Sequence, residues 1–219
     1  MITLSFQETL KAIFELWKKS YVSLFPFTVL VVFCFDSSLL VDNIIIAILL
    51  CFPGLYLSNI ILLKLANVFH QESIKEEAFY SLAFARYPNA LMLFLGLGGI
   101  FLLCFLLASS LLGFLFGLVI ALLLLVLYSY LLFAWPLVVI DNLDPIQSIK
   151  KSFALINNHI GYITAIFLTV GIIQAGCYAI LLLLVGMKAT SLIYNLLFTT
   201  LNLALSVVVL ESLKGKQSI

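Results

Sequence analysis

The order of apolar and polar residues along the chain predicts a helical membrane protein. Long apolar runs alternate with short polar segments, and six of the runs approach the length of a membrane crossing, for which about 20 helical residues suffice. We assign these spans to residues 21–35, 44–68, 90–107, 113–140, 160–185 and 191–210. The first is short for a hydrocarbon core of about 30 Å, so we expect it to extend past Asp36 or to lie where the bilayer is thin.

The chain also carries an internal repeat of about 70 residues. A helix-start pattern, Ser or Asp followed three residues later by Glu or Gln, occurs as Ser5 with Glu8, Ser73 with Glu76, and Asp144 with Gln147. The first side chain of such a pair accepts a hydrogen bond from a free backbone N–H, and the second reaches back to the first residue's own N–H. Each pair precedes an amphipathic segment and two apolar runs. This order predicts three parallel repeats, 5–72, 73–143 and 144–219, within one membrane domain.

The segment that opens each repeat has the polarity of an amphipathic helix. The apolar positions are Leu10, Ile13, Phe14, Trp17 and Tyr21 in the first repeat, and Ile146, Ile149, Phe153, Ile156 and Ile160 in the third. They recur with a period of about 3.6 residues and oppose lysines and other polar residues, whereas the middle repeat shows a weaker pattern. Such helices usually lie flat on the membrane surface, although a cytoplasmic extension of a tilted span would show the same pattern.

Single residues inside the spans predict local geometry. Pro26, Pro53 and Pro136 should kink the helices that contain them, because proline cannot donate a backbone hydrogen bond. Gly96, Gly98 and Gly99 should let the third span approach a neighbouring helix closely.

Composition excludes a soluble globular fold. Of the 219 residues, 64% are hydrophobic and 10% are charged, with a mean hydropathy of +1.26, against roughly 45–50% apolar and 25% charged in soluble domains. The net charge is +1 and the basic residues are scattered, so we expect no nucleic-acid partner. Membrane lipids, other inner-membrane proteins or a second copy of the chain are the expected partners.

The distribution of basic residues predicts the orientation in the membrane. With six spans, ten of the eleven Lys and Arg residues fall on the side that holds both termini, and Lys188 alone falls on the other. Because cytoplasmic loops are enriched in Lys and Arg, we place both termini and the amphipathic segments in the cytoplasm, with the protein in the bacterial inner membrane.

A polar stripe follows one face of the last span. Its members, Ser191, Asn195, Thr199, Asn202 and Ser206, recur every three or four residues. Amide side chains are costly against lipid, so the stripe must face protein or water. Gln174 lies at a similar depth in the fifth span, and we expect a hydrogen bond between Gln174 and Asn202. The stripe either holds helices together or lines a polar cavity.

Titratable residues are rare at membrane depth. Lys64 and Glu211 lie near the cytoplasmic ends of their spans, and we expect them to form an interfacial ion pair. His70 and His159 lack a metal-ligand spacing, Asp141 and Asp144 are expected at the surface, and the four cysteines form no Cys-x-x-Cys pair. The sequence therefore predicts no catalytic centre, no metal site and no cofactor.

One segment resembles a known family. It is the run Pro136-Leu137-Val138-Val139-Ile140-Asp141, followed by Asp144-Pro145 and a helix containing Ser148, Ser152 and Asn158. This segment resembles the YciC-like bacterial inner-membrane proteins, and it is similar to the membrane domain attached to some glycerophosphodiester phosphodiesterases. The resemblance implies a six-span inner-membrane protein of unsettled function. No hydrolase activity carries over, because the phosphodiesterase catalytic domain is lacking.

Three functions follow from these observations. The first is a non-enzymatic structural or regulatory role in the cell envelope. The second is a small transporter or channel that uses the stripe of the last span. The third is an enzyme acting on lipid headgroups through Asp141, His159 and surface lysines, although no nucleophile and base stand at a suitable spacing.

Overall fold

The computed structural model describes residues 4–35, 44–71, 74–111 and 130–216, and all regular secondary structure within these ranges is α-helical. The helices are α1 (Phe6–Phe35), α2 (Ile44–His70), α3 (Glu76–Leu111), α5 (Ala134–Asp141), α6 (Pro145–Val185) and α7 (Met187–Lys216). Of these, α1, α2, α6 and α7 are long and apolar enough to cross a membrane. The all-α prediction is confirmed for the described residues, whereas the three-repeat arrangement stays a prediction. Residues 113–129 of the predicted fourth span lie outside the described part of the chain.

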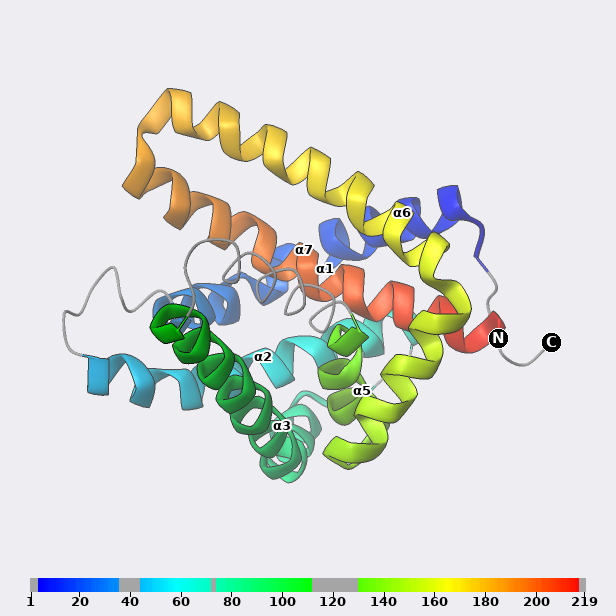
Figure 1. Cartoon of the computed structure of the whole chain (residues 1–219). Helices are drawn as coiled ribbons and strands as arrows, with labels where there is room; N and C mark the ends of the chain where they lie inside the picture. The colour runs from blue at the N-terminus through cyan, green and yellow to red at the C-terminus, as the bar shows by residue number, and fades with distance from the viewer. Residues whose placement is uncertain (1–3, 36–43, 72–73, 112–129, 217–219) are drawn as a thin grey trace.

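Helix α2 lies among the other helices and contacts α1, α3, α5 and α7. Helices α6 and α7 form an antiparallel hairpin whose orange turn lies at the left of Figure 1, whereas the first turn of α1 and the last turn of α7 lie at the right. These two helix ends therefore lie on the same side of the molecule.

Of the three predicted helix starts, the first is formed with both of its hydrogen bonds, and the third is formed through its cap residue. The Ser5 N–H donates to Glu8 Oε2 at 2.7 Å, and the Glu8 N–H donates to Ser5 Oγ at 3.4 Å, which is a reciprocal capping box. At the start of α6, Asp144 Oδ1 accepts from the N–H groups of Ile146 and Gln147, and Pro145 occupies the first helical position. Ser73, of the remaining pair, lies outside the described residues.

The predicted fourth span is interrupted near its end. Residues 132–133 form a turn, and α5 then begins at Ala134 with Pro136 in its first turn. Because proline has no N–H, it cannot continue a helix by bonding the carbonyl four residues earlier, but it is tolerated where a helix begins. Pro136 therefore marks a helix break in this span.

Small polar side chains mark the buried faces of α1 and α6. In α1 the residues buried at successive turns include Thr9, Ser20 and Thr28, and in α6 they include Ser148 and Ser152. The predicted apolar positions are divided: Ile13 and Ile156 are 0% and 3% exposed, whereas Ile146 is 66% and Ile160 52% exposed. In a membrane, small residues allow close helix packing while large apolar residues can face lipid, so exposure of the latter two agrees with a face turned toward the membrane.

The amphipathic segments are joined directly to the helices that follow them. Helix α1 runs without interruption from Phe6 to Phe35, and α3 from Glu76 to Leu111. In α6 His159 leaves helical geometry, with φ −138° and ψ 23°, and Figure 1 shows the helix changing direction between its yellow-green start and its yellow remainder. The first and second segments thus match the alternative of an extended span, and only the third is set off by a kink.

A close helix approach occurs at Gly54, a glycine that the sequence analysis did not single out. A Cβ added to Gly54 in α2 would lie 2.9 Å from Cys34 Cβ in α1, whereas one added to Gly96, Gly98 or Gly99 would meet nothing within 4 Å among the described residues. Because residues 112–129, which hold most of the predicted fourth span, lie outside the described part of the chain, the close approach expected of these three glycines stays a prediction.

The Gly54 contact predicts opposite effects of two alanine substitutions. Gly54→Ala should destabilise the protein by roughly 1–3 kcal/mol through overpacking against α1, despite the better helix propensity of alanine. Gly171→Ala in α6, where an added Cβ meets nothing within 4 Å, should leave stability unchanged or raise it. Denaturant unfolding in detergent measures both changes, and equal effects would contradict the packing assignment.

Candidate functional site

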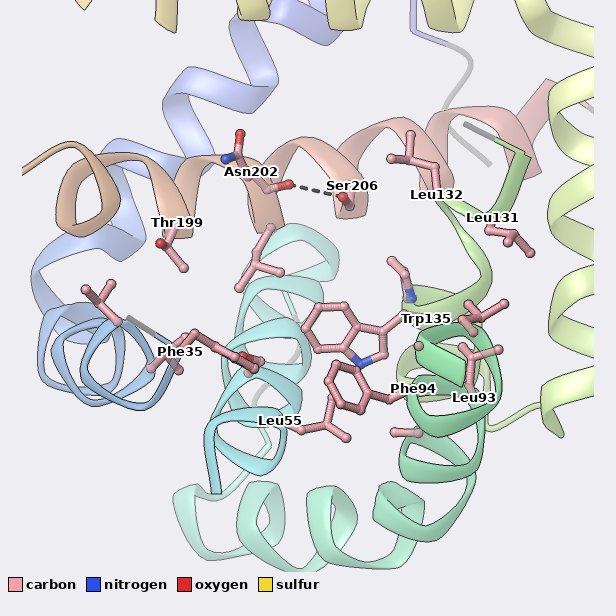
Figure 2. Close-up of a pocket in the computed structure, with 18 of the residues that line it drawn as sticks. Phe35, Leu55, Leu93, Phe94, Leu131, Leu132, Trp135, Thr199, Asn202 and Ser206 are labelled. Atoms are coloured by element: carbon pink, nitrogen blue, oxygen red, sulfur yellow. Dashed lines mark hydrogen bonds between the residues drawn. The ribbon is translucent and has the colours of Figure 1, made fainter. Parts of the chain in front are cut away.

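A cavity of about 630 Å³ lies between α1, α2, α3, α5 and α7. Helix α7 supplies one wall through four members of the polar stripe, namely Asn195, Thr199, Asn202 and Ser206. Figure 2 shows Thr199, Asn202 and Ser206 along one helix, with Leu55, Phe94 and Trp135 across the cavity. The stripe therefore lines a hollow in the protein. Ser191, its first member, is not among the residues that line it.

The expected bond between the last two helices is present. Gln174 Nε2 donates to Asn202 Oδ1 at 2.7 Å, and Gln174 Oε1 accepts from the Tyr194 hydroxyl at 3.2 Å. Gln174 is 9% exposed, and the nitrogen and the oxygen of its side-chain amide each find a partner within the hairpin. The prediction of this contact is confirmed. Asn202 thus joins α6 to α7 and lines the cavity as well.

The polar wall offers uncharged groups to the cavity. The Thr199 hydroxyl donates to the Asn195 carbonyl at 2.6 Å, and the Ser206 hydroxyl donates to the Asn202 carbonyl at 3.1 Å. Each hydroxyl donates its proton to a carbonyl of its own helix, and its oxygen can still accept a hydrogen bond from another donor. The described lining residues include no Asp, Glu, Lys, Arg or His. The cavity therefore suits a neutral molecule with a hydrogen-bonding group and an apolar body.

A buried amide fixes one aromatic wall. Trp135 Nε1 donates to Asn59 Oδ1 at 2.9 Å, and Asn59 is fully buried in α2. This contact orients the indole ring of Trp135 along the cavity. The sequence analysis missed Asn59, although an amide in the middle of an apolar segment is a usable signal of an interhelical bond.

A charged network lies at the opposite end of the same helices. Asp141, at the end of α5, binds Lys151 of α6 at 2.9 Å and Lys214 of α7 at 2.5 Å. Lys214 also binds Glu211 at 2.6 Å, and the second oxygen of Glu211 lies 3.3 Å from His70 Nε2. The side chains of Asp141, Glu211 and Lys214 are each no more than 20% exposed. We call these five residues the charge network.

Arg86 connects helix α3 to the end of α5, beside the charge network. Its Nη1 donates to the carbonyls of Val139 and Ile140, the latter at 3.0 Å. These carbonyls lie in the last turn of α5, where free acceptors and the helix dipole favour a cation. A second cavity, of about 310 Å³, lies between Arg86, the charge network and apolar residues of α2 and α3.

The structure corrects two predictions about charged residues. Lys64 binds Glu76 at 2.5 Å and lies over the rings of Phe27 and Phe79, so it does not pair with Glu211. Glu211 binds Lys214 and His70 in its place. Asp141 lies within the charge network rather than at the surface. Helical phase alone cannot show which of several nearby opposite charges a side chain will face.

Burial and lysine contacts act in opposite directions on Asp141. Burial acts to raise the pKa of Asp141, but the hydrogen bonds and charges of Lys214 and Lys151 outweigh it, so the pKa is lowered overall. Burial likewise lowers the pKa of Arg86, and the nearby charge of Asp141 opposes that effect. Both groups are charged at neutral pH.

The described residues contain no group of three or more His, Cys, Asp or Glu side chains that could hold a metal ion. Both carboxylate oxygens of Asp141 accept hydrogen bonds from lysines, and His159 lies at the kink of α6.

The chain matches no protein-family model, and no curated protein or solved structure is detectably similar to it. The resemblance to YciC-like proteins therefore remains a prediction carried by the segment that begins at Pro136.

The charge network predicts a pH-dependent contribution to stability. Asp141→Asn should lower the free energy of unfolding by roughly 1–3 kcal/mol at pH 7, between the values for surface and fully buried ion pairs. Because the pKa of Asp141 is lowered on folding, this contribution is complete above about pH 4 and is lost as the pH falls through the folded-state pKa. Thermal unfolding of both proteins between pH 3 and pH 7 measures it.

An exposed ion pair supplies the control. Lys11 and Glu15 of α1 lie 3.7 Å apart with side chains 75% and 68% exposed, so Glu15→Gln should cost less than about 1 kcal/mol. A difference between wild type and Asp141→Asn that stays constant down to pH 3 would contradict the assignment.

Proposed function

We propose that this chain is a non-enzymatic multi-pass protein of the inner membrane, with cytoplasmic termini, that binds a neutral amphipathic small molecule within the bilayer. The observation that carries the proposal is the placement of four stripe residues on the wall of one cavity. The excess of basic residues on the side of the termini supports the orientation.

The size and polarity of the cavity support this class of ligand. Its volume of about 630 Å³ lies within the range of small-molecule sites, roughly 300–1,000 Å³. One wall carries the hydroxyl groups of Thr199 and Ser206, and the facing wall carries Leu55, Phe94 and Trp135. A molecule with one or two uncharged polar groups on an apolar body satisfies both walls, and a monoacylglycerol is a simple representative.

The same cavity favours ligand binding over the two alternative functions, an ion channel and a purely structural stripe. An ion channel needs charged groups or carbonyl rings along its path, and the described lining has no ionisable side chain of the Asp, Glu, Lys, Arg or His type. A purely structural stripe would be packed against other side chains rather than placed along a hollow. Binding supports either carriage of the ligand or a regulatory response to it, and it requires no catalytic residue.

Thiol labelling tests whether the cavity accepts molecules. In a chain whose four native cysteines are replaced, single cysteines at Thr199 and Ser206 should react with a small impermeant methanethiosulfonate at least about tenfold faster than cysteines at Leu201 and Ala204. The latter two residues lie at similar depth on α7 but are 1% and 0% exposed. A monoacylglycerol such as 1-decanoylglycerol should slow labelling at Thr199 and Ser206.

Equal labelling rates at the four positions, or labelling that the monoacylglycerol does not change, would contradict the proposal. Thr199→Trp provides an independent check, because the indole ring should fill the cavity and abolish binding of the monoacylglycerol while leaving the Gln174 to Asn202 contact in place.

A further inference from the structure

We propose that the second cavity binds the phosphodiester of a membrane phospholipid, with Arg86 as the anchor for the anion. The site is distinct from the cavity lined by the polar stripe, and the inference does not depend on the function proposed above. It rests on the charge balance, the geometry of Arg86 and the composition of the cavity walls.

Among the described residues, the charges of Arg86 and the charge network do not balance. Arg86 and Lys214 line the cavity together with Asp141 and Glu211, and Lys151, which is not part of the lining, binds Asp141, so these five side chains carry one excess positive charge without counting His70. A half-buried cluster with an unmatched cation favours a bound anion, because uncompensated charge is costly away from water. A phosphodiester carries a single negative charge and would neutralise the excess.

Arg86 is the cation that remains unmatched. Lys151 and Lys214 each bind a carboxylate, whereas Arg86 Nη1 donates to the two carbonyls at the end of α5. Among the described residues no carboxylate lies within ion-pair distance of its guanidinium. The carbonyl contacts hold one edge of the planar group, and its other N–H groups can form the charge-assisted bonds that phosphate oxygens accept.

The remaining walls favour a lipid over a free phosphate. Leu63, Ala66, Phe79, Leu82 and Ile140 line the cavity beside the charged groups. These side chains would contact the glycerol and the first methylene groups of an acyl chain. The cavity lies at the helix ends that the distribution of basic residues places at the cytoplasmic face, which is the depth at which headgroups lie.

Binding of a short-chain phospholipid tests the proposal. The purified, delipidated protein should show a saturable rise in Tm of roughly 2–4 °C or more with dihexanoylphosphatidylglycerol, and no comparable rise with dihexanoylglycerol, which lacks the phosphate. Arg86→Gln should abolish the rise. Lys150→Gln removes an exposed lysine of α6 beside the network and should retain the rise.

Two further comparisons keep the test decisive. Leu82→Trp should fill the cavity and abolish the rise with every charge intact, and Thr199→Trp, which blocks the other cavity, should leave the rise unchanged. A wild-type response in Arg86→Gln, or loss of the response in Thr199→Trp, would overturn the proposal. An equal rise with inorganic phosphate alone would overturn the assignment to a lipid.

Discussion

The ammonium group of Lys214 is shared between two carboxylates, and the arrangement of the helix ends depends on this contact. Asp141, which binds Lys214, belongs to α5 and also binds Lys151 of α6. Glu211, the second partner of Lys214, contacts His70 of α2. Arg86 adds α3 by binding the last carbonyls of α5. Because a partly buried charge without a partner is costly, these contacts fix five helix ends relative to one another.

Polarity falls in steps from the charge network along the same helices. Next to it lies a layer of fully or almost fully buried apolar residues, 60–62 of α2, 137–139 of α5 and 207–210 of α7. Beyond this layer the first cavity has amide and hydroxyl groups and no charges of the Asp, Glu, Lys or Arg type among its described lining residues. Charges at the ends and uncharged hydrogen-bonding groups at depth are the order that a bilayer imposes.

The sequence predicted features that depend on one helix or on membrane depth. The caps at Ser5 and Asp144 are local, and the Gln174 to Asn202 bond follows from two amides at equal depth in adjacent spans. Features that depend on how helices rotate against one another could not be predicted in this way. The partner of Lys64 and the burial of Asp141 are of that kind, because several opposite charges lie within reach of each.

A double-mutant cycle on Asp141 and Lys214 tests most directly whether this shared contact holds the helix ends together. The free energy of unfolding would be measured for the wild type, Asp141→Asn, Lys214→Gln and the double variant under the same conditions. The contact predicts that the double variant is less destabilised than the sum of the single changes, by about 1 kcal/mol or more. Effects that add to within about 0.5 kcal/mol would show that the two residues act independently and would contradict this account.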